Sequence, residues 1–221
     1  MHLIRNLTMS ITIDQSPIAL AKKLAKIFPT YVIGYDNPNY TIQNKQILEF
    51  LGTEAFTPGP HQPFQTVDNH LENRPELVDF FKWVNICLED YRKTFKYHCE
   101  GFKVVLSWAN KADKNGAHRM HVHPNSFLSG IYYVSENPTP TLFEDPKYQV
   151  RSGLYVASMH EINDSVWPCP SETGSLVLFP SWLPHYTSEN PTLEGWRYTL
   201  SFNVIPVGGT NKGSLTEINL S

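Results

Sequence analysis

The chain has 221 residues, 41% of them hydrophobic and 18% charged, which is typical of a globular protein rather than a disordered or repetitive one. The formal net charge of −3 and the pI near 6.3 provide no bulk attraction to nucleic acid or to an anionic membrane. The length is sufficient for one substantial core, so we expect a single domain over residues 1–221.

Cysteine usage and the first residues predict the cellular compartment. Cys87, Cys99 and Cys169 are too few and too scattered for a disulfide framework or a Cys-based zinc site. The apolar residues of segment 1–17 are interrupted by charged and polar ones, so the segment lacks a signal-peptide core, and no later run is long enough to span a bilayer. We therefore expect a cytoplasmic protein without a membrane partner.

The first 100 residues are predicted to form a mixed helical support region. Residues 16–28 begin with Ser and Pro in the capping and first helical positions and then repeat apolar residues every four positions, which predicts a short amphipathic helix. Residues 73–99 space apolar residues three or four apart and predict a long helix with one face against a sheet. The Pro- and Gly-bearing residues 57–65 between them predict a loop. Trp83 and Trp108 are interpreted as core residues.

Short strand-forming runs alternate with turns in the rest of the chain. These runs are residues 102–108, 127–134, 140–145, 153–159, 174–180 and 196–206. Strands that follow one another without intervening helices favour a sandwich or barrel over a parallel α/β sheet. We expect the barrel to cover residues 101–206 and to be followed by a tail, residues 207–221.

Two histidines flank one valine in RMHVHPNSFLSGIYYV, which covers residues 119–134. Residues two apart on an extended strand face the same side, so His121 and His123 present both imidazoles to one face, while Met120 and Val122 face the other. Such a pair supplies two metal ligands, although neighbouring histidines also occur on surfaces and in hydrogen-bonded cores.

A third histidine follows a later strand. GSLVLFPSWLPHYT, residues 174–187, places a glycine turn, an apolar strand and a Pro-bounded corner ahead of His185. A histidine at the rim of a distant strand can reach the other two across the mouth of a barrel. The three imidazoles would then form an open, facial metal site.

The alternation in EGWRYTLSFNVIP, residues 194–206, places Arg197, Thr199, Ser201 and Asn203 on one strand face. An antiparallel strand with one wet face explains this pattern. In a barrel with a metal at its mouth, however, the polar face can line the cavity. Arg197, with the hydroxyl of Thr199 nearby, could then bind a carboxylate.

The segments HVHPNSFLSGIYYV, LFEDP, LVLFPSWLPH and RYTLSFN, in this order, resemble the 2-oxoglutarate- and Fe(II)-dependent oxygenases, with prolyl-hydroxylase-like relatives among them. The resemblance covers residues 108–204. It implies a mainly β protein with flanking helices, whose core is a double-stranded β-helix, the jelly-roll barrel also found in cupins. It also implies that Fe(II) is held by an H-x-D/E pair and a distal His, and that 2-oxoglutarate binds the iron through its 2-oxo acid end.

The resemblance assigns roles to individual residues. His121 corresponds to the first metal ligand, His185 to the distal ligand, and Arg197 to the basic residue that anchors the far carboxylate of 2-oxoglutarate. Tyr133 resembles a tyrosine of some relatives whose phenol hydrogen-bonds the same carboxylate, and it is equally well explained as a half-buried strand aromatic. Further candidates for hydrogen bonds to the co-substrate or a ligand are Thr199, Asn110 and Asn203, and each asparagine could also simply satisfy backbone groups.

The chain departs from the family pattern at position 123, where a histidine replaces the expected Asp or Glu. We expect His123 to be the third metal ligand, which makes a three-His set and leaves the iron with its full charge of +2. Glu144 and Asp145 are rival carboxylates, but a strand-ending turn before Pro146 explains them better.

The implied reaction is the oxidative decarboxylation of 2-oxoglutarate by O₂ to succinate and CO₂, coupled to hydroxylation of a substrate that the motifs do not specify. A cupin-type three-His metalloenzyme that does not use 2-oxoglutarate is an alternative that explains the histidines but not Arg197. A barrel that binds a small acid or a partner without catalysis is a second alternative.

Overall fold

The computed structural model describes residues 28–58, 63–136, 139–147 and 164–220. Tyr31–Ser221 forms one compact unit, and Met1–Thr30 forms another, of which only the last residues are described. All but the last residue of the helix expected over residues 16–28, and the whole strand expected over residues 153–159, therefore lie outside the described residues. None of the described helices is long and apolar enough to cross a membrane.

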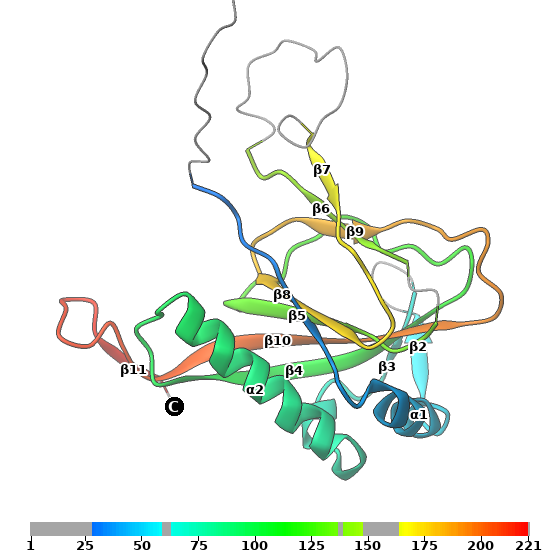
Figure 1. Cartoon of the computed structure of the whole chain (residues 1–221), viewed down its shortest axis with the longest axis horizontal. Helices are drawn as coiled ribbons and strands as arrows, with labels where there is room; N and C mark the ends of the chain where they lie inside the picture. Colours follow the sequence, from blue (N-terminus) through cyan, green and yellow to red (C-terminus); the bar gives the residue numbers. More distant parts are fainter. Residues whose placement is uncertain (1–27, 59–62, 137–138, 148–163, 221) are drawn as a thin grey trace, which may run out of the picture. The chain divides into compact units, whose positions relative to one another are not determined.

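Two antiparallel sheets form the body of the larger unit (Figure 1). The eight-stranded sheet has the order β1 (Ile33–Asp36), β8 (Ser175–Pro180), β5 (Leu128–Tyr133), β10 (Arg197–Thr210), β4 (Gly101–Ala112), β3 (Phe64–Thr66) and β2 (Phe56–Pro58), with β11 (Ile218–Leu220) paired to β10. The three-stranded sheet has the order β7 (Val166–Pro168), β6 (Thr141–Glu144) and β9 (His185–Thr187). This arrangement is the double-stranded β-helix, and the predicted fold class is confirmed.

The two helices are α1 (Tyr40–Leu51) and α2 (Val78–Thr94), and α2 packs on the face of the large sheet that points away from the small one (Figure 1). Phe80 of α2 contacts Tyr132 of β5 with ring centroids 4.8 Å apart, and Phe81 contacts Phe202 of β10 at 6.4 Å. The helix predicted over residues 73–99 is shorter, because the 3₁₀ turns η1 (Leu71–Asn73) and η2 (Pro75–Leu77) precede it and Lys96 adopts a left-handed backbone conformation beyond its end.

The opposite face of the large sheet packs against the small sheet. Tyr133, Val177 and Phe179 project from β5 and β8 toward Phe143 of β6 and form a second buried cluster there. Because Tyr132 joins the helix-side core and Tyr133 the inter-sheet core, β5 is buried on both faces. The candidate site lies beside this inter-sheet cluster.

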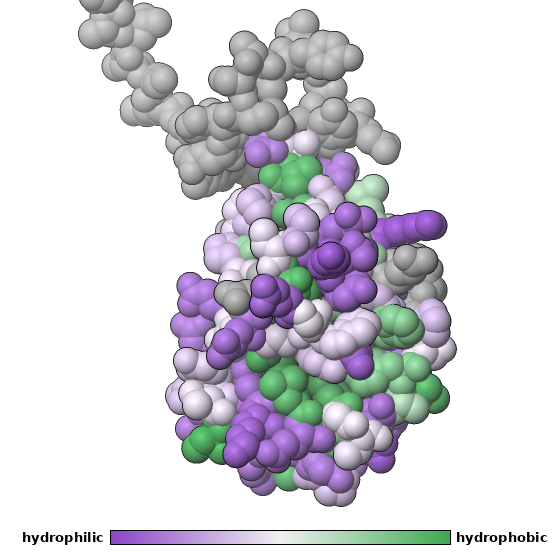
Figure 2. Space-filling model, turned by 90° about the vertical axis from the view of Figure 1, so that its right-hand side faces the viewer, coloured by the Kyte–Doolittle hydropathy of each residue, from purple (hydrophilic) through white to green (hydrophobic). Residues whose placement is uncertain are grey.

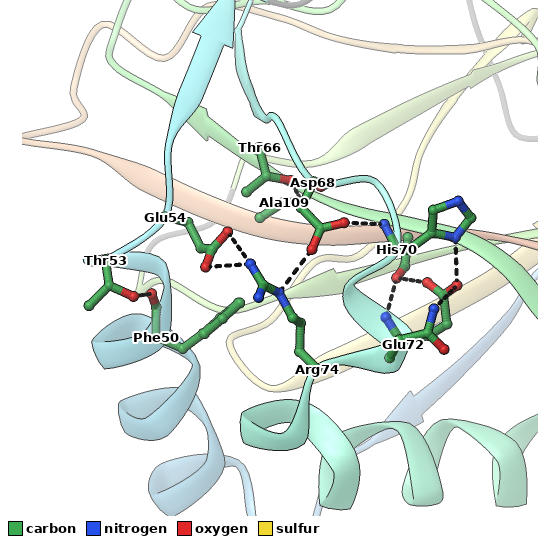
Figure 3. Close-up of polar contacts among 11 residues, drawn as sticks. Phe50, Thr53, Glu54, Thr66, Asp68, His70, Glu72, Arg74 and Ala109 are labelled. Atoms are coloured by element: carbon green, nitrogen blue, oxygen red, sulfur yellow. Dashed lines mark hydrogen bonds and ion pairs between the residues drawn. The ribbon is translucent and has the colours of Figure 1, made fainter.

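A network of polar contacts fixes the segment between the two helices to β4 (Figure 3). Arg74 donates from Nη2 to both carboxylate oxygens of Glu54 at 2.9 Å, and it forms an ion pair with Asp68, whose Oδ2 lies 2.8 Å from Nε. Farther along, Glu72 accepts from the hydroxyl of Ser107 at 2.5 Å. Backbone pairing of β3 with β2 and with β4 shortens the loop expected over residues 57–65, because β2 and β3 take up its two ends.

The outer surface over α1, β2 and β3 mixes apolar and polar residues (Figure 2). Leu48, Phe64 and Trp196 are exposed there. The ring of Trp196 lies between Phe64, at a centroid distance of 6.0 Å, and Lys111, whose Nζ lies 4.6 Å from the ring centroid. Since side chains alternate along a strand, holding Trp196 on this outer face directs the next residue, Arg197, inward.

The last residues contribute a strand. β10 continues to Thr210, and β11 pairs with it through Gly208, Gly209 and Thr210. The segment expected as a tail from residue 207 onward is therefore partly a strand hairpin at the edge of the large sheet.

Candidate metal and co-substrate site

A short backbone pairing positions the three histidines. His121 and His185 form an isolated antiparallel bridge in which each backbone N–H donates to the carbonyl of the other at 3.0 Å, and the N–H of His123 donates to the carbonyl of Ser181 at 2.9 Å. The extended backbone sends Met120 and Val122 outward, with 56% and 44% of their surface exposed. The alternation read from the sequence is thus present here.

The imidazoles of His121, His123 and His185 converge. One ring nitrogen of each lies within 4.8 Å of those of the other two, and the Nε2 atoms of His123 and His185 are 3.2 Å apart. Among the described residues, no carboxylate belongs to this cluster. The structure therefore brings together the three histidines that the motifs singled out.

The Nδ1 atom of each imidazole forms a hydrogen bond to an oxygen atom of the protein. Nδ1 of His121 lies 2.8 Å from the carbonyl oxygen of Arg119, and Nδ1 of His185 lies 2.9 Å from that of Leu183. Nδ1 of His123 lies 2.7 Å from Oδ1 of Asn203. Since these oxygens accept hydrogen bonds, each Nδ1 carries the proton and each Nε2 carries a lone pair, which is the arrangement that ligates a metal.

The environment keeps the imidazoles of His123 and His185 neutral. Burial, and then the neighbouring His121, lower the pKa of His123 to about 4, and the same two causes lower the pKa of His185 to about 3. At neutral pH the Nε2 lone pairs of His123 and His185 thus face each other, and this repulsion would be relieved by a cation placed among the three rings. Three neutral imidazoles fit a divalent transition metal such as Fe(II).

The rival carboxylates lie elsewhere. Neither Glu144 nor Asp145 lines the pocket that contains the histidines. Asp145 accepts a hydrogen bond from the backbone N–H of Lys147 at 2.9 Å, in the turn that ends β6. This agrees with their interpretation as strand-ending residues.

Arg197 lies in the same pocket and is 5% exposed. Its Nη2 donates to the carbonyl oxygen of Gly116 at 2.8 Å and to the hydroxyl of Thr187 at 3.4 Å, while its buried Nε has no hydrogen-bond partner. No ion pair among the described residues includes Arg197, and burial lowers its pKa. Burying a cation without a carboxylate partner costs free energy, and binding of an anion beside Arg197 would offset that cost.

Hydroxyl groups surround the guanidinium. Tyr133 shares a hydrogen bond of 2.8 Å with Thr141, and burial raises the pKa of the Tyr133 phenol, which therefore keeps its proton. Thr199 lies two residues from Arg197 on the same face of β10 and also lines the pocket. The space between these side chains measures about 520 Å³, counting the part that is open to solvent.

Both polar atoms of the Asn110 amide form hydrogen bonds within the protein. Its Oδ1 accepts from Gln65 and from Trp108, both at 3.2 Å, and its Nδ2 donates to Thr199 at 3.3 Å and Ser201 at 3.0 Å. Asn110 therefore orients the hydroxyl of Thr199 at the wall of the pocket.

Sequence reasoning missed several residues of the pocket, among them one tryptophan and one histidine. Trp108, interpreted as a core residue, stacks on His123 with ring centroids 5.7 Å apart and planes 20° apart, and His118 lies 6.0 Å from His121. Trp108 and Asn110 are two apart on β4, so the alternation used for β10 could have placed both on the pocket side.

A double-stranded β-helix with converging imidazoles and a buried arginine in one pocket defines a class of protein, the mononuclear non-haem metal oxygenases that use a 2-oxo acid. Residues 106–203 match the family model described as "Putative 2OG-Fe(II) oxygenase", where 2OG is 2-oxoglutarate. The resemblance read from the motifs is therefore confirmed over this part of the chain. No protein of curated function matches the sequence.

Solved structures agree in fold. A prolyl-4-hydroxylase from Pseudomonas putida is 12% identical with a TM-score of 0.57, and the match covers 81% of this chain and 94% of that one. HygX from Streptomyces hygroscopicus, solved with nickel, 2-oxoglutarate and hygromycin B, is 12% identical with a TM-score of 0.56 over 80% and 83% of the two chains. A prolyl hydroxylase from Trichoplax adhaerens, in complex with a hypoxia-inducible-factor peptide, is 13% identical with a TM-score of 0.56 over 79% and 83%. At these identities the likeness concerns the fold alone.

Proposed function

We propose that this protein is a 2-oxoglutarate- and Fe(II)-dependent dioxygenase that hydroxylates its substrate and releases succinate and CO₂. One observation carries the proposal: the pocket combines three converging imidazoles with a buried guanidinium that has no carboxylate partner among the described residues. A cupin-type three-His enzyme needs only the first of these features.

In this proposal His121, His123 and His185 hold Fe(II) through Nε2. When bound, the iron would provide the open coordination positions at which O₂ is activated, while the four electrons that reduce O₂ come from the 2-oxo acid and the substrate, two from each. The nickel and 2-oxoglutarate named in the HygX structure support this choice of metal and co-substrate class.

Arg197 binds the distal carboxylate of 2-oxoglutarate, with the phenol of Tyr133 and the hydroxyl of Thr199 as hydrogen-bond donors beside it. Asn110 contributes indirectly, since it holds Thr199. Three neutral ligands leave the charge of a divalent metal uncompensated, and Arg197 adds a second positive charge. A dianionic co-substrate that spans both positions neutralises most of this charge.

The proposal assigns the reaction to residues 101–206 and a supporting role to residues 1–100. It places the enzyme in the cytoplasm, where the free thiols of Cys87, Cys99 and Cys169 would stay reduced. The substrate is a separate molecule that enters beside the histidines.

The test is an anaerobic Fe(II) titration with and without 2-oxoglutarate, followed through the visible metal-to-ligand charge-transfer band. We expect the band in the unmodified protein, its loss in His185→Ala, and a need for much more 2-oxoglutarate in Arg197→Ala. Iron binding without a band at any 2-oxoglutarate concentration would favour the cupin-type enzyme. No iron binding would favour a non-catalytic barrel.

A further inference from the structure

We propose that Asn203 is a positioning residue, which selects the tautomer of His123 that can ligate the metal. This inference rests on the proposed metal site. It concerns the tautomer that one of the three proposed ligands adopts in the metal-free protein.

The three histidines differ in what holds them. His121 and His185 direct Nδ1 toward backbone carbonyl oxygens, which can only accept a hydrogen bond, so their tautomer is determined by the main chain. His123 directs Nδ1 toward a side-chain amide. An amide has an oxygen on one side and an NH₂ group on the other, so the tautomer of His123 depends on which side Asn203 presents.

The two orientations of the amide have opposite consequences for the site. With Oδ1 toward His123, as observed at 2.7 Å, the proton sits on Nδ1 and the Nε2 lone pair points at the metal position. With the NH₂ group there instead, His123 would carry its proton on Nε2. That proton would point at Nε2 of His185, 3.2 Å away, and close the site with an internal hydrogen bond.

Two serines favour the first orientation. The hydroxyl of Ser129, the cross-strand partner of Asn203, donates to Oδ1 at 3.0 Å and lies 2.9 Å from the hydroxyl of Ser181. Because Ser129 uses its proton on Asn203, the hydroxyl of Ser181 donates to Ser129. Both serines are 1% exposed and Asn203 is 6% exposed, so bulk water does not compete for these bonds.

Ser181 thereby constrains His123 in two ways, through its backbone and through its side chain. Its carbonyl oxygen accepts the backbone N–H of His123 at 2.9 Å, and its hydroxyl acts on the imidazole through Ser129 and Asn203. An amide performs this task without adding a charge, which keeps the pocket positive for an anionic co-substrate.

The first measurement is the nitrogen-15 spectrum of the histidine rings in metal-free protein at pH 8, where protonated and unprotonated ring nitrogens have distinct shifts. His123→Gln identifies the signals of residue 123. We expect His123 with its proton on Nδ1 in the unmodified protein. A proton on Nε2 would overturn the proposal.

The second measurement is the affinity for Zn²⁺ and Ni²⁺. Asn203→Leu removes the acceptor at similar volume, and we expect it to move the proton of His123 to Nε2 and weaken metal binding about 10- to 100-fold. Asn203→Asp retains the acceptor and should restore the Nδ1 proton and most of the affinity. Asn203→Leu with unchanged affinity and tautomer would overturn the proposal.

Asn44→Ala is the matched control. Asn44 is also 6% exposed and hydrogen-bonded on both sides, to Val134 and Tyr132, but it belongs to α1 and does not line the pocket. Asn44→Ala should lower the stability of the protein without changing the tautomer of His123 or the metal affinity.

If Asn203→Leu fails to fold, Ser129→Ala provides a second test. This variant removes the hydroxyl that orients the Asn203 amide, so His123 must then show a mixture of both tautomers. If the unmodified protein binds no metal, the proposed function fails, and the metal-free spectra still test the role of Asn203.

Discussion

The indole of Trp108 lies nearly parallel to the imidazole of His123, with the ring centroids 5.7 Å apart. Trp108 also donates its Nε1–H to Asn110, so one side chain contacts a candidate metal ligand and the residue that orients Thr199. This relationship makes the indole a reporter of the site.

We predict that Ni²⁺ binding quenches the fluorescence of the protein mainly through Trp108, because a paramagnetic ion bound by His123 lies next to its ring. The measurement is a fluorescence titration of the unmodified protein and of Trp108→Phe, which keeps an aromatic ring. Most of the quenching should disappear in Trp108→Phe, while Ni²⁺ affinity by calorimetry changes only a few-fold. Equal quenching in both proteins would contradict the proposed position of the metal.

Substitution of Arg197 should weaken 2-oxoglutarate binding and leave metal binding intact. Removing one partner of a buried charge pair costs at least about 2 kcal/mol, so the Kd of Arg197→Met for 2-oxoglutarate should rise about 30-fold or more. Arg197→Lys should recover only part of this loss, because an ammonium group does not reproduce the planar guanidinium.

The control ligand for this prediction is 2-oxobutyrate, which has the 2-oxo acid end but no second carboxylate. Its affinity should be the same in the unmodified protein and in Arg197→Met. Equal weakening of both acids would mean that Arg197 acts on the metal end of the pocket.

The metal-free protein should lose stability as the pH falls below about 6.5. Unfolded histidines take up protons near that pH, whereas burial holds the folded-state pKa of His123 at about 4 and that of His185 at about 3. The unfolded chain therefore binds more protons in this window, and the free energy of unfolding falls by up to about 1.4 kcal/mol per pH unit for each histidine.

Urea unfolding between pH 5 and pH 7.5 measures this slope. His185→Asn removes one of the two groups and should give a shallower slope than the unmodified protein. Identical slopes would show that His185 titrates alike in both states.

The close approach of Phe202 to Gly130 predicts a sharp size limit in the core. The two residues are cross-strand partners on β10 and β5, and a Cβ at position 130 would collide with the Phe202 ring. Gly130→Ala should lower the free energy of unfolding by about 1–3 kcal/mol, as overpacking does. The control is Gly34→Ala in β1, where a Cβ would meet nothing within 4 Å. Urea unfolding should separate the two variants, and equal stabilities would contradict the packing seen at Phe202.

Much of the site was predictable from the sequence because strand periodicity is a local property. The spacing of His121 and His123, and the alternation that begins at Arg197, each depend only on side chains pointing to opposite faces in turn. The same rule explains why the predicted bounds of β5 and β8, and the predicted start of β10, lie within one residue of the observed ones.

The remaining features depend on pairing between distant segments. β2, β7 and β9 have only three residues each and exist because a neighbouring strand bonds to them. α1 buries Asn44, whose partners Tyr132 and Val134 are far away in sequence, so its pattern is weakly helical. The role of Asn203 likewise requires the register that places Ser129 opposite it.

β10 carries both Arg197, the proposed carboxylate anchor, and Asn203, the amide that contacts His123. The strand therefore fixes the spacing between these two residues. Arg197 and Asn203 lie six residues apart on one continuous strand, which corresponds to about 20 Å of extended backbone. Changes in the loops at the mouth of the pocket would not alter this spacing. In the proposed site, the sheet therefore determines the length of the 2-oxo acid that fits between the metal and the guanidinium group of Arg197. In the proposed site, we therefore expect changes in the loops to alter the choice of substrate more readily than the choice of co-substrate.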